Sequence, residues 1–392
     1  ANGVIETTDG RYIRILEIEP INFMLRSDEE QFNIISSFAS WLKISPMRMQ
    51  FKSMTRKADS DRHVAMVRAE LEAEENESCK RLGEGYIRLI KDVGSREALT
   101  RRFFLIFQYE ELRRGDGEDY GQVLSMMQAA EQTARAYFFQ CGNSILDPKD
   151  PDEATAEILY MFFNRRSCVD EPFQSRVNRV VIDTMATKQK VIGIDPVPHI
   201  RISNFLAPRG IDLNHHHYVV MDGLYYTFLY IKGNGYPSMV RAGWMSSLIN
   251  AGEGVDVDVF LRRENRSKSI DKVAQRIRLN RTKLKSMQDT SSDYEELANS
   301  IQSGYYIKHG LSNNEDLFYL SIFVTVSAKS YEELMWRKQQ MVDMLKSMDM
   351  YVSDCRFQQE AAFRSVMPFV KMAPSLETKS QRNVLTLSLI HI

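Results

Sequence analysis

Apolar positions along the chain follow two periods, that of a strand and that of an amphipathic helix. Residues 225–231 form a β-branched and aromatic run that is typical of a strand. Val240, Trp244 and Leu248 then recur at helical spacing. From 255 to 259 valine alternates with aspartate, which is the period of a half-buried strand. This stretch is therefore predicted as strand, helix and strand.

The same order of elements occurs near the start of the chain. Residues 10–20 (G-R-Y-I-R-I-L-E-I-E-P) resemble residues 223–233 (G-L-Y-Y-T-F-L-Y-I-K-G). Later in each half, the apolar strand that begins at Arg101 matches the one that begins at Asp316. A helix and a short strand follow each of them, so each half has the order β-α-β, helical insertion, β-α-β. This order is the split βαβ, ferredoxin-like pattern.

We therefore predict an α+β fold of two related ferredoxin-like lobes, each with a long helical-hairpin insertion. The insertions are expected at 60–95 and 267–303, with the break in the first near Gly83 and Gly85. The predicted parts of the chain are a first α+β lobe (1–148), a helical and extended linker (149–204), a second α+β lobe (205–370) and a connecting segment (371–392).

Composition adds little to this picture. With 392 residues the chain is long enough for two or three domains, and its net charge of −1 predicts no particular partner. The four cysteines lack C-x-x-C spacing, which favours a reducing compartment and argues against a zinc ribbon. No apolar run approaches the roughly 18–20 residues that span a bilayer, so no transmembrane segment is predicted. The first residue is Ala1, so a missing N-terminal portion is left open.

Motifs that would hold a nucleotide, a metal ion or a catalytic nucleophile are not found in the sequence. It has no G-x-x-x-x-G-K-[ST] and no G-x-G-x-x-G after a strand, so nothing is predicted to hold phosphates. His215, His216 and His217 are consecutive, and residues of an extended segment point to alternate faces, so one ion is not expected to bind all three. Catalytic, cofactor and metal residues are therefore predicted as none.

Paired carboxylates are the remaining candidates for chemistry. Asp256 and Asp258 share one face of their strand, about 7 Å apart by the strand rise. Such a pair could hold Mg²⁺ or act in acid–base catalysis. The alternation with valine favours a simpler interpretation, the polar face of a half-buried strand, and the same holds for Glu17 and Glu19. A metal-dependent enzyme built on Asp256 and Asp258 stays open as a less favoured alternative.

Charge is most uneven in the second helical insertion. Between 262 and 287 ten basic residues are opposed only by Glu264 and Asp271. The basic residues, all candidate partner or anion contacts, are Arg262, Arg263, Arg266, Lys268, Lys272, Arg276, Arg278, Arg281, Lys283 and Lys285. The first insertion is acidic instead, with Glu70, Glu72, Glu74, Glu75 and Glu77. A basic helix can bind phosphate backbones or anionic lipid, but without interleaved aromatics it does not suggest base stacking. A solvated arm or a protein contact is the favoured interpretation.

Several segments of the second half resemble the N-terminal region of the VirB4-type ATPases of type IV secretion and conjugation, in particular the TraE- or TrbE/CagE-like versions. These segments are F-L-A-P-R-G-I-D from Phe205, D-G-L-Y-Y-T-F-L-Y-I-K-G-N-G-Y-P from Asp222, G-W-M-S-S-L from Gly243 and V-D-V-D-V-F-L-R-R from Val255. Residues 378–386, T-K-S-Q-R-N-V-L-T, resemble the R-N-V-L-T element that precedes the motor in that family.

The resemblance implies a non-catalytic N-terminal docking and assembly portion of a VirB4-like ATPase that energises conjugative DNA transfer or type IV secretion. In that family the Walker motifs follow R-N-V-L-T, and this sequence ends at Ile392 before any such motif, so no catalytic residue is carried over. Segment 371–392 would begin the connection to the ATPase domain. ATP and Mg²⁺ would belong to the full-length protein, and the implied location is the cytoplasmic face of the cell membrane.

The expected partners are other secretion subunits and the protein's own motor domain. A homo-oligomer and nucleic-acid binding through the basic arm stay open. The alternative function is a stand-alone binding module whose basic helical arm holds DNA or anionic lipid.

Overall fold

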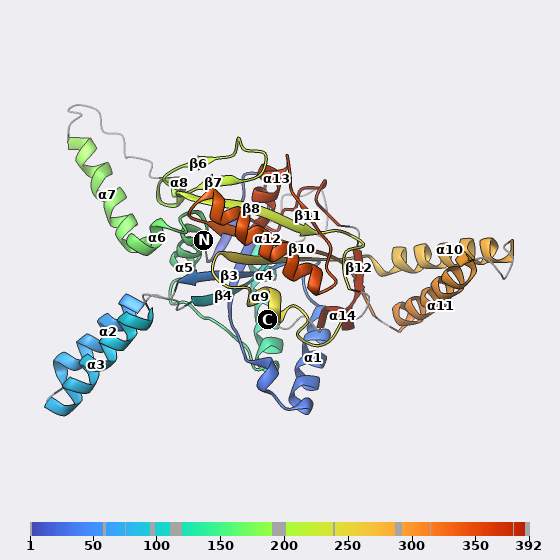
Figure 1. The fold of residues 1–392 in the computed structure, drawn as a ribbon, viewed down its shortest axis with the longest axis horizontal. Coiled ribbons are helices and arrows are strands. Elements are labelled where there is room, and N and C mark those ends of the chain that lie inside the picture. Colours follow the sequence, from blue (N-terminus) through green and yellow to red (C-terminus); the bar gives the residue numbers. More distant parts are fainter. Residues whose placement is uncertain are drawn as a thin grey trace.

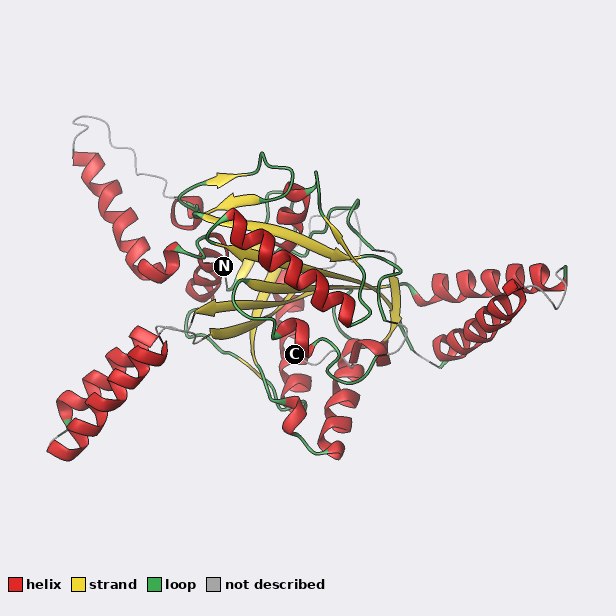
Figure 2. Ribbon diagram, viewed as in Figure 1, coloured by secondary structure: helices red, strands yellow, loops and turns green. Residues whose placement is uncertain are grey.

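The computed structural model describes residues 2–57, 60–74, 76–94, 99–109, 120–189, 201–237, 240–286, 292–313, 315–378 and 380–388. These residues form a mixed fold of helices around one antiparallel sheet of twelve strands (Figures 1 and 2). Helices cover the sheet, and α2–α3, α7 and α10–α11 extend outward from it (Figure 1). The part of the predicted linker at 190–200 lies outside the described residues.

The strands are short at the sheet margins and long in its centre. They are β1 (Val4–Glu6), β2 (Tyr12–Glu19), β3 (Arg48–Lys57), β4 (Leu99–Gln108), β5 (Ser144–Ile145), β6 (Ile211–Asp212), β7 (Val219–Met221), β8 (Leu224–Ile231), β9 (Val255–Arg263), β10 (Leu317–Ala328), β11 (Val352–Asp354) and β12 (Ser380–Asn383).

The helices precede, connect and cover these strands. They are the 3₁₀ helix η1 (Phe23–Leu25) and α1 (Asp28–Leu42), α2 (Ser60–Ala73), α3 (Glu77–Gly94), α4 (Tyr120–Gln140), α5 (Pro151–Phe163), α6 (Ser167–Asp170), α7 (Phe173–Gln189), α8 (Ile202–Leu206), α9 (Ser246–Ile249), α10 (Arg266–Lys285), α11 (Ser292–Ser312), α12 (Tyr331–Ser347), α13 (Gln359–Val366) and α14 (Val384–Ser388).

Strand pairing follows one rule in both halves of the chain. In the first half the neighbours run β5, β2, β4, β3, and in the second half they run β11, β8, β10, β9, all antiparallel. The two inner strands also pair with each other, with Phe51 opposite Val259. The halves are therefore joined into one continuous sheet by backbone hydrogen bonds, which the prediction of two lobes with a helical linker did not foresee.

This central pairing determines where the helical insertions project. The α2–α3 hairpin follows β3, and the α10–α11 hairpin follows β9. Because β3 and β9 are antiparallel, their C-terminal ends lie at opposite ends of the sheet. The two hairpins accordingly extend in opposite directions (Figure 1).

The hairpins lie at the predicted places, but the predicted break in the first was wrong. Gly83 and Gly85 are inside α3, since α2 ends at Ala73 and α3 begins at Glu77. A side chain at Gly83 would overlap Leu71 of α2, so this glycine allows the two helices to approach closely. Gly83 is therefore explained by the close packing of α2 on α3, and not by a reversal of the chain.

One face of the sheet is covered by α1, α4, α9 and α12, which enclose the largest apolar core. Trp41 of α1 meets Phe138 of α4 edge-on, with ring centroids 5.1 Å apart, and packs on Phe51 of β3. Within the described residues, the helix predicted from Val240, Trp244 and Leu248 is observed only as the four residues of α9, and Gly243, at φ +70°, precedes it in a left-handed conformation.

The opposite face is also covered, by α5 over the first half and by α13 over the second. Phe162 packs on Phe104 with ring centroids 5.5 Å apart, and Phe363 packs on Phe228 at 6.3 Å. Strand β9 is therefore buried on both faces from Val255 to Leu261. The prediction of a half-buried strand was wrong here, because the covering helices come from distant parts of the chain.

Helix α5 begins at Pro151 with a capped first turn, and the contribution of this cap to stability can be tested. Asp150 caps the helix by accepting hydrogen bonds from the backbone N–H of Asp152 (2.9 Å) and Glu153 (3.1 Å), and Pro151 occupies the first helical position. We expect Asp150→Ala to lower the free energy of unfolding by about 1 kcal/mol. Asp150→Asn should retain most of this stability, since an amide oxygen can accept the same hydrogen bonds from the first turn. Urea unfolding measures the stability of both variants. Equal losses of stability in Asp150→Ala and Asp150→Asn would contradict a capping role for this side chain.

Candidate functional site

The ten basic residues singled out in the sequence are divided by the structure between the sheet and the second hairpin. Arg262 and Arg263 end β9, and the other eight lie on α10. Asn265 caps α10 by accepting from the backbone N–H of Lys268 at 3.2 Å. The candidate surface is therefore centred on α10, and the two strand arginines stand apart from it.

The basic residues nearest the sheet are engaged within the fold. Arg262 donates to Glu377 at 2.9 Å and lies over the ring of Tyr319, with 4.3 Å from its guanidinium carbon to the ring centroid. Arg263 donates to the carbonyl oxygen of Leu42 at 2.9 Å, and burial lowers the pKa of its guanidinium. These side chains hold the end of β9 against neighbouring segments.

Two ion pairs at the root of α10 tie the hairpin to the sheet. Arg266 pairs with buried Asp316 at 2.8 Å. Lys272 pairs with buried Glu264 at 2.5 Å, and Glu264 also accepts from Tyr319 of β10 at 3.0 Å and from Gln381 of β12. Burial alone would raise the pKa of Glu264, but the hydrogen bonds from Lys272 and Tyr319 hold it below its usual value. The root of the hairpin is thus an ordered polar network.

From this root outward, a basic stripe runs along the face of α10 that is turned away from α11. We define the basic stripe as Lys268, Lys272, Arg276 and Lys283, which fall on one side of a helix that advances about 100° per residue. Ile277, which points the other way, packs against Gly304 of α11. All four stripe residues are exposed, and within the described residues only Lys272 of the four forms an ion pair.

The remaining basic residues of α10 lie outside this stripe. Arg281 donates to the hydroxyl of Tyr305 on α11 at 3.1 Å, so it braces the hairpin. Arg278 and Lys285 are exposed. Charge alone could locate these residues in the sequence, but only the packing of α10 on α11 separates bracing residues from outward ones.

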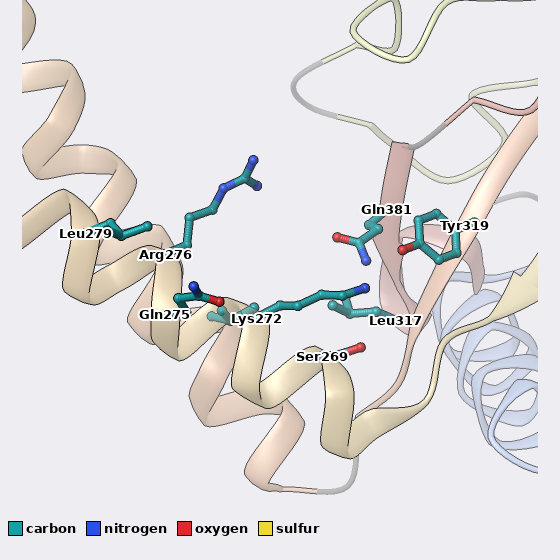
Figure 3. Close-up of a pocket in the computed structure, with 9 residues that line it drawn as sticks. Ser269, Lys272, Gln275, Arg276, Leu279, Leu317, Tyr319 and Gln381 are labelled. Carbon is teal, nitrogen blue, oxygen red and sulfur yellow. The ribbon is translucent and has the colours of Figure 1, made fainter.

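A cleft of about 430 Å³ opens between α10 and the edge formed by β10 and β12 (Figure 3). Lys272 reaches across it toward β12, and Arg276 extends beside it (Figure 3). The cleft is lined by Ser269, Lys272, Val273, Gln275, Arg276, Leu279, Leu317, Tyr319 and Gln381. Its mixture of cationic and apolar side chains suits a partner that offers carboxylates beside apolar groups.

The acidic pair of β9 lies elsewhere, buried at the junction of the two halves. Asp258 is fully buried and pairs with Lys52 of β3 at 2.8 Å, with Gln50 also donating at 2.8 Å. Asp256 pairs with Arg165, which follows α5, and accepts from the backbone N–H of Thr55 at 3.0 Å. Both carboxylates share a face, as predicted, but each is neutralised by a cation from another part of the chain.

The protonation of these groups follows from their burial. Burial raises the pKa of Asp258, and the charge of Lys52 opposes the rise. For Arg165, burial would lower the pKa, but Asp256 outweighs it and raises the pKa above the ordinary arginine value. In the described residues no group of three or more His, Cys, Asp or Glu side chains is placed to hold a metal ion. We therefore assign this cluster to the fold.

The other sequence candidates have local contacts. Glu17 forms an ion pair with Arg102 at 2.6 Å, and Glu19 accepts from the hydroxyl of Ser144. His215 stacks on Tyr218 with ring centroids 4.2 Å apart, and His216 packs on Phe357 at 4.7 Å.

The segment with the R-N-V-L-T element is built into the second half. Its residues 380–383 form β12, which pairs antiparallel with β10 and places Asn383 opposite Leu317. Arg382 lies over the ring of Tyr236, 5.0 Å from its centroid, and Val384 is buried. Lys379 and residues 389–392 lie outside the described residues. The segment therefore contributes Gln381 to the wall of the cleft beside α10.

Comparison with known families adds a finding for the first half. Residues 1–129 match the Archaeal TraC-like domain. The match runs from β1 into α4, whereas the resemblance noted above rests mainly on the second half. It relates the protein to conjugation and type IV secretion. No curated protein matches the chain. Among the described helices, none has the length and apolar content needed to cross a bilayer.

Proposed function

We propose that this chain is the N-terminal docking and assembly region of a TraC/VirB4-type ATPase that energises conjugative DNA transfer or type IV secretion. The observation that carries the proposal is the TraC-like match over residues 1–129. It is supported from the second half by the R-N-V-L-T segment, which pairs with β10. We interpret each half as a ferredoxin-like lobe, since the strand order is the same in both.

The proposed mechanism is mechanical coupling. A continuous sheet with helices on both faces is a stiff body that can transmit a force between its ends. The outward hairpins offer contact surfaces to other secretion subunits at the inner face of the cell membrane. The sequence contains no nucleotide-binding motif, so ATP and Mg²⁺ would act in the motor domain of the full-length protein.

A transfer assay tests this role. The chain expressed beside an intact conjugation system of the same source should occupy the docking place without supplying a motor. We expect the frequency of DNA transfer to fall at least about tenfold, because the chain, expressed in excess, competes by mass action for the docking place of the intact subunit. Purified chain should hydrolyse ATP no faster than buffer.

The matched control is the Gly254→Ala variant, expressed at the same level as the parent chain. Its sheet is expected to be strongly destabilised. Inhibition by the intact chain but not by this variant supports docking. Unaltered transfer together with failure to recover secretion subunits on the tagged chain would overturn the proposal, as would ATP hydrolysis at rates typical of motors.

A second candidate function is favoured by the exposed basic stripe of α10. Such a stripe could hold DNA or anionic lipid, with binding that weakens steeply as salt rises. Glu295 and Glu296, exposed near the start of α11, place negative charge on the same hairpin and oppose a polyanion. Reversal of Arg276, Arg278, Arg281 and Lys283 to glutamate would abolish DNA binding if this candidate holds.

A further inference from the structure

The two helical hairpins carry opposite charge, the first at its tip and the second along α10. We define the acidic tip as Glu70, Glu72, Glu74 and Glu77, which lie where α2 gives way to α3. Glu70, Glu72 and Glu77 are exposed, and Glu74 is half-buried. Lys80, Arg81 and Arg88 follow on α3, and Lys80 pairs with Glu77 at 3.8 Å, so the excess of acidic residues lies at the tip.

Both hairpins also expose apolar side chains beside these charges. On α3, Leu82, Tyr86 and Leu89 recur at helical spacing on one face and are 78%, 46% and 59% exposed. On the second hairpin, Leu279 lies on the same face of α10 as the basic stripe and is 56% exposed. Exposed apolar side chains next to charged ones are typical of a protein–protein interface. Contact buries the apolar area, and the charges determine which partner binds.

The acidic tip and the basic stripe of one chain lie far from each other. They belong to hairpins that extend in opposite directions because β3 and β9 are antiparallel (Figure 1). Complementary surfaces held at opposite ends of a stiff body can meet only between two copies. A contact of this kind is heterologous, so it repeats from copy to copy until a ring closes or a filament grows.

We infer that copies of this chain associate head to tail, with the acidic tip of one copy against the basic stripe of the next. The cleft beside the stripe receives the tip. Arg276, in its wall, faces the carboxylates, and Leu279 offers apolar contact. Lys268 is exposed on the same face of α10. Lys272 remains paired with Glu264 and contributes less. This interface does not depend on the docking role proposed above.

A second copy fits this surface better than a nucleic acid does. The cleft wall includes the apolar Leu279, which is 56% exposed and which a phosphate backbone would not cover. The acidic tip supplies the complementary charge within the same chain, so no further component is needed. Electrostatic complementarity of this type raises the association rate at low salt and weakens as salt screens it.

Charge reversal on each side tests the interface by sedimentation of the intact chain at about 50 mM salt, where screening is weak. A basic-side variant carries Lys268→Glu, Arg276→Glu and Lys283→Glu, and an acidic-side variant carries Glu70→Lys, Glu72→Lys and Glu77→Lys. We expect the parent chain to form species larger than a dimer. Each variant alone should associate at least about tenfold more weakly, with unchanged thermal unfolding.

Mixing gives the decisive result. In an equal mixture, the introduced lysines of the acidic-side variant meet the introduced glutamates of the basic-side variant. The intact basic stripe of the acidic-side variant also meets the intact acidic tip of the basic-side variant. The mixture should therefore regain association that neither variant shows alone. A parent that stays monomeric at low salt, or variants that associate as well as the parent, would overturn the inference. Association restored only by added DNA would instead favour the nucleic-acid candidate.

Cross-linking locates the contact independently. Cys79 on α3 is exposed, whereas Cys141, Cys168 and Cys355 are buried. We expect Gln275→Cys, in the wall of the cleft, to be joined to Cys79 of a second copy by a short bis-maleimide. Cys79→Ser in the same background should abolish the product. Efficient cross-links between Cys79 and Cys79 in the parent chain would show that like tips meet, and would contradict the head-to-tail arrangement.

Discussion

Replacing Lys52 by methionine is expected to lower the free energy of unfolding by about 3–5 kcal/mol. Lys52 is 4% exposed and its ammonium group lies 2.8 Å from the carboxylate of Asp258, which is fully buried. The same ammonium group donates to the carbonyl oxygen of Val366 at 3.1 Å. Without it, a negative charge stays in the interior with only Gln50 as a side-chain donor within the described residues, and such a charge costs several kcal/mol.

The matched control removes both charges. Lys52→Met combined with Asp258→Leu leaves no buried ion, so we expect the double variant to be within about 1–2 kcal/mol of the parent. Urea unfolding followed by circular dichroism measures all three proteins. Equal losses in the single and double variants would show that packing, and not charge, determines the effect.

The single variant should also acquire a pH dependence. Burial already raises the pKa of Asp258, and loss of Lys52 removes the charge that opposes the rise. A carboxyl whose pKa is higher in the folded state binds its proton more tightly there than in the unfolded chain. The stability of Lys52→Met should therefore fall as pH increases from the ordinary value of 3.8 toward the raised folded value. A flat profile there would contradict this origin.

The position of this pair explains why it matters for the whole molecule. Lys52 and Asp258 are direct cross-strand partners in the pairing of β3 with β9. Arg165 and Asp256 form a second buried ion pair at the same junction. A slip of one residue would turn Lys52 to the opposite face of the sheet and leave both charges without partners. We propose that these ion pairs specify how the two halves join, a role in which buried charge is used for specificity more than for stability.

Much of the fold within each half could be predicted because it depends on local patterns. Runs of β-branched and aromatic residues located β2 and β8, and the charged helical stretches located both hairpins. The join between the halves could not be predicted in this way. It pairs residues about two hundred positions apart, such as Lys52 and Asp258, and the pattern of a strand does not specify which edge it will pair with.

The candidate site, like the fold, could be predicted only where it depends on local sequence patterns. A run of basic residues in the sequence indicated α10, and the structure confirms that most of them are exposed. The network at its root was missed, because Glu264, Tyr319 and Gln381 come together only when β9, β10 and β12 are adjacent. The acidic pair was misjudged as a solvent-facing strand surface, since nothing near Asp256 in the sequence indicates that α5 and α13 cover it.

Gly254→Ala should cost about 2–5 kcal/mol, through two separable effects. Gly254 has φ +76°, a left-handed conformation that costs other residues about 1–2 kcal/mol. A methyl group there would also overlap the carbonyl oxygen of Ser327 in β10, and forced overlap in a packed site adds about 1–3 kcal/mol. The carbonyl oxygen of Gly254 accepts from the N–H of Ser327 at 2.7 Å, so this backbone has little freedom to move.

Gly252 provides the control for this substitution two residues earlier in the same turn. It also has positive φ, +105°, but a methyl group there would meet no described atom within 4 Å. Gly252→Ala therefore carries the conformational cost alone, and the difference between the two variants in urea unfolding isolates the steric part. Equal losses would mean that β10 can retreat from β9 at this turn. A larger loss of stability for Gly254→Ala would show that β9 and β10 must approach closely where β9 begins. This close approach would then hold the second half of the sheet in register.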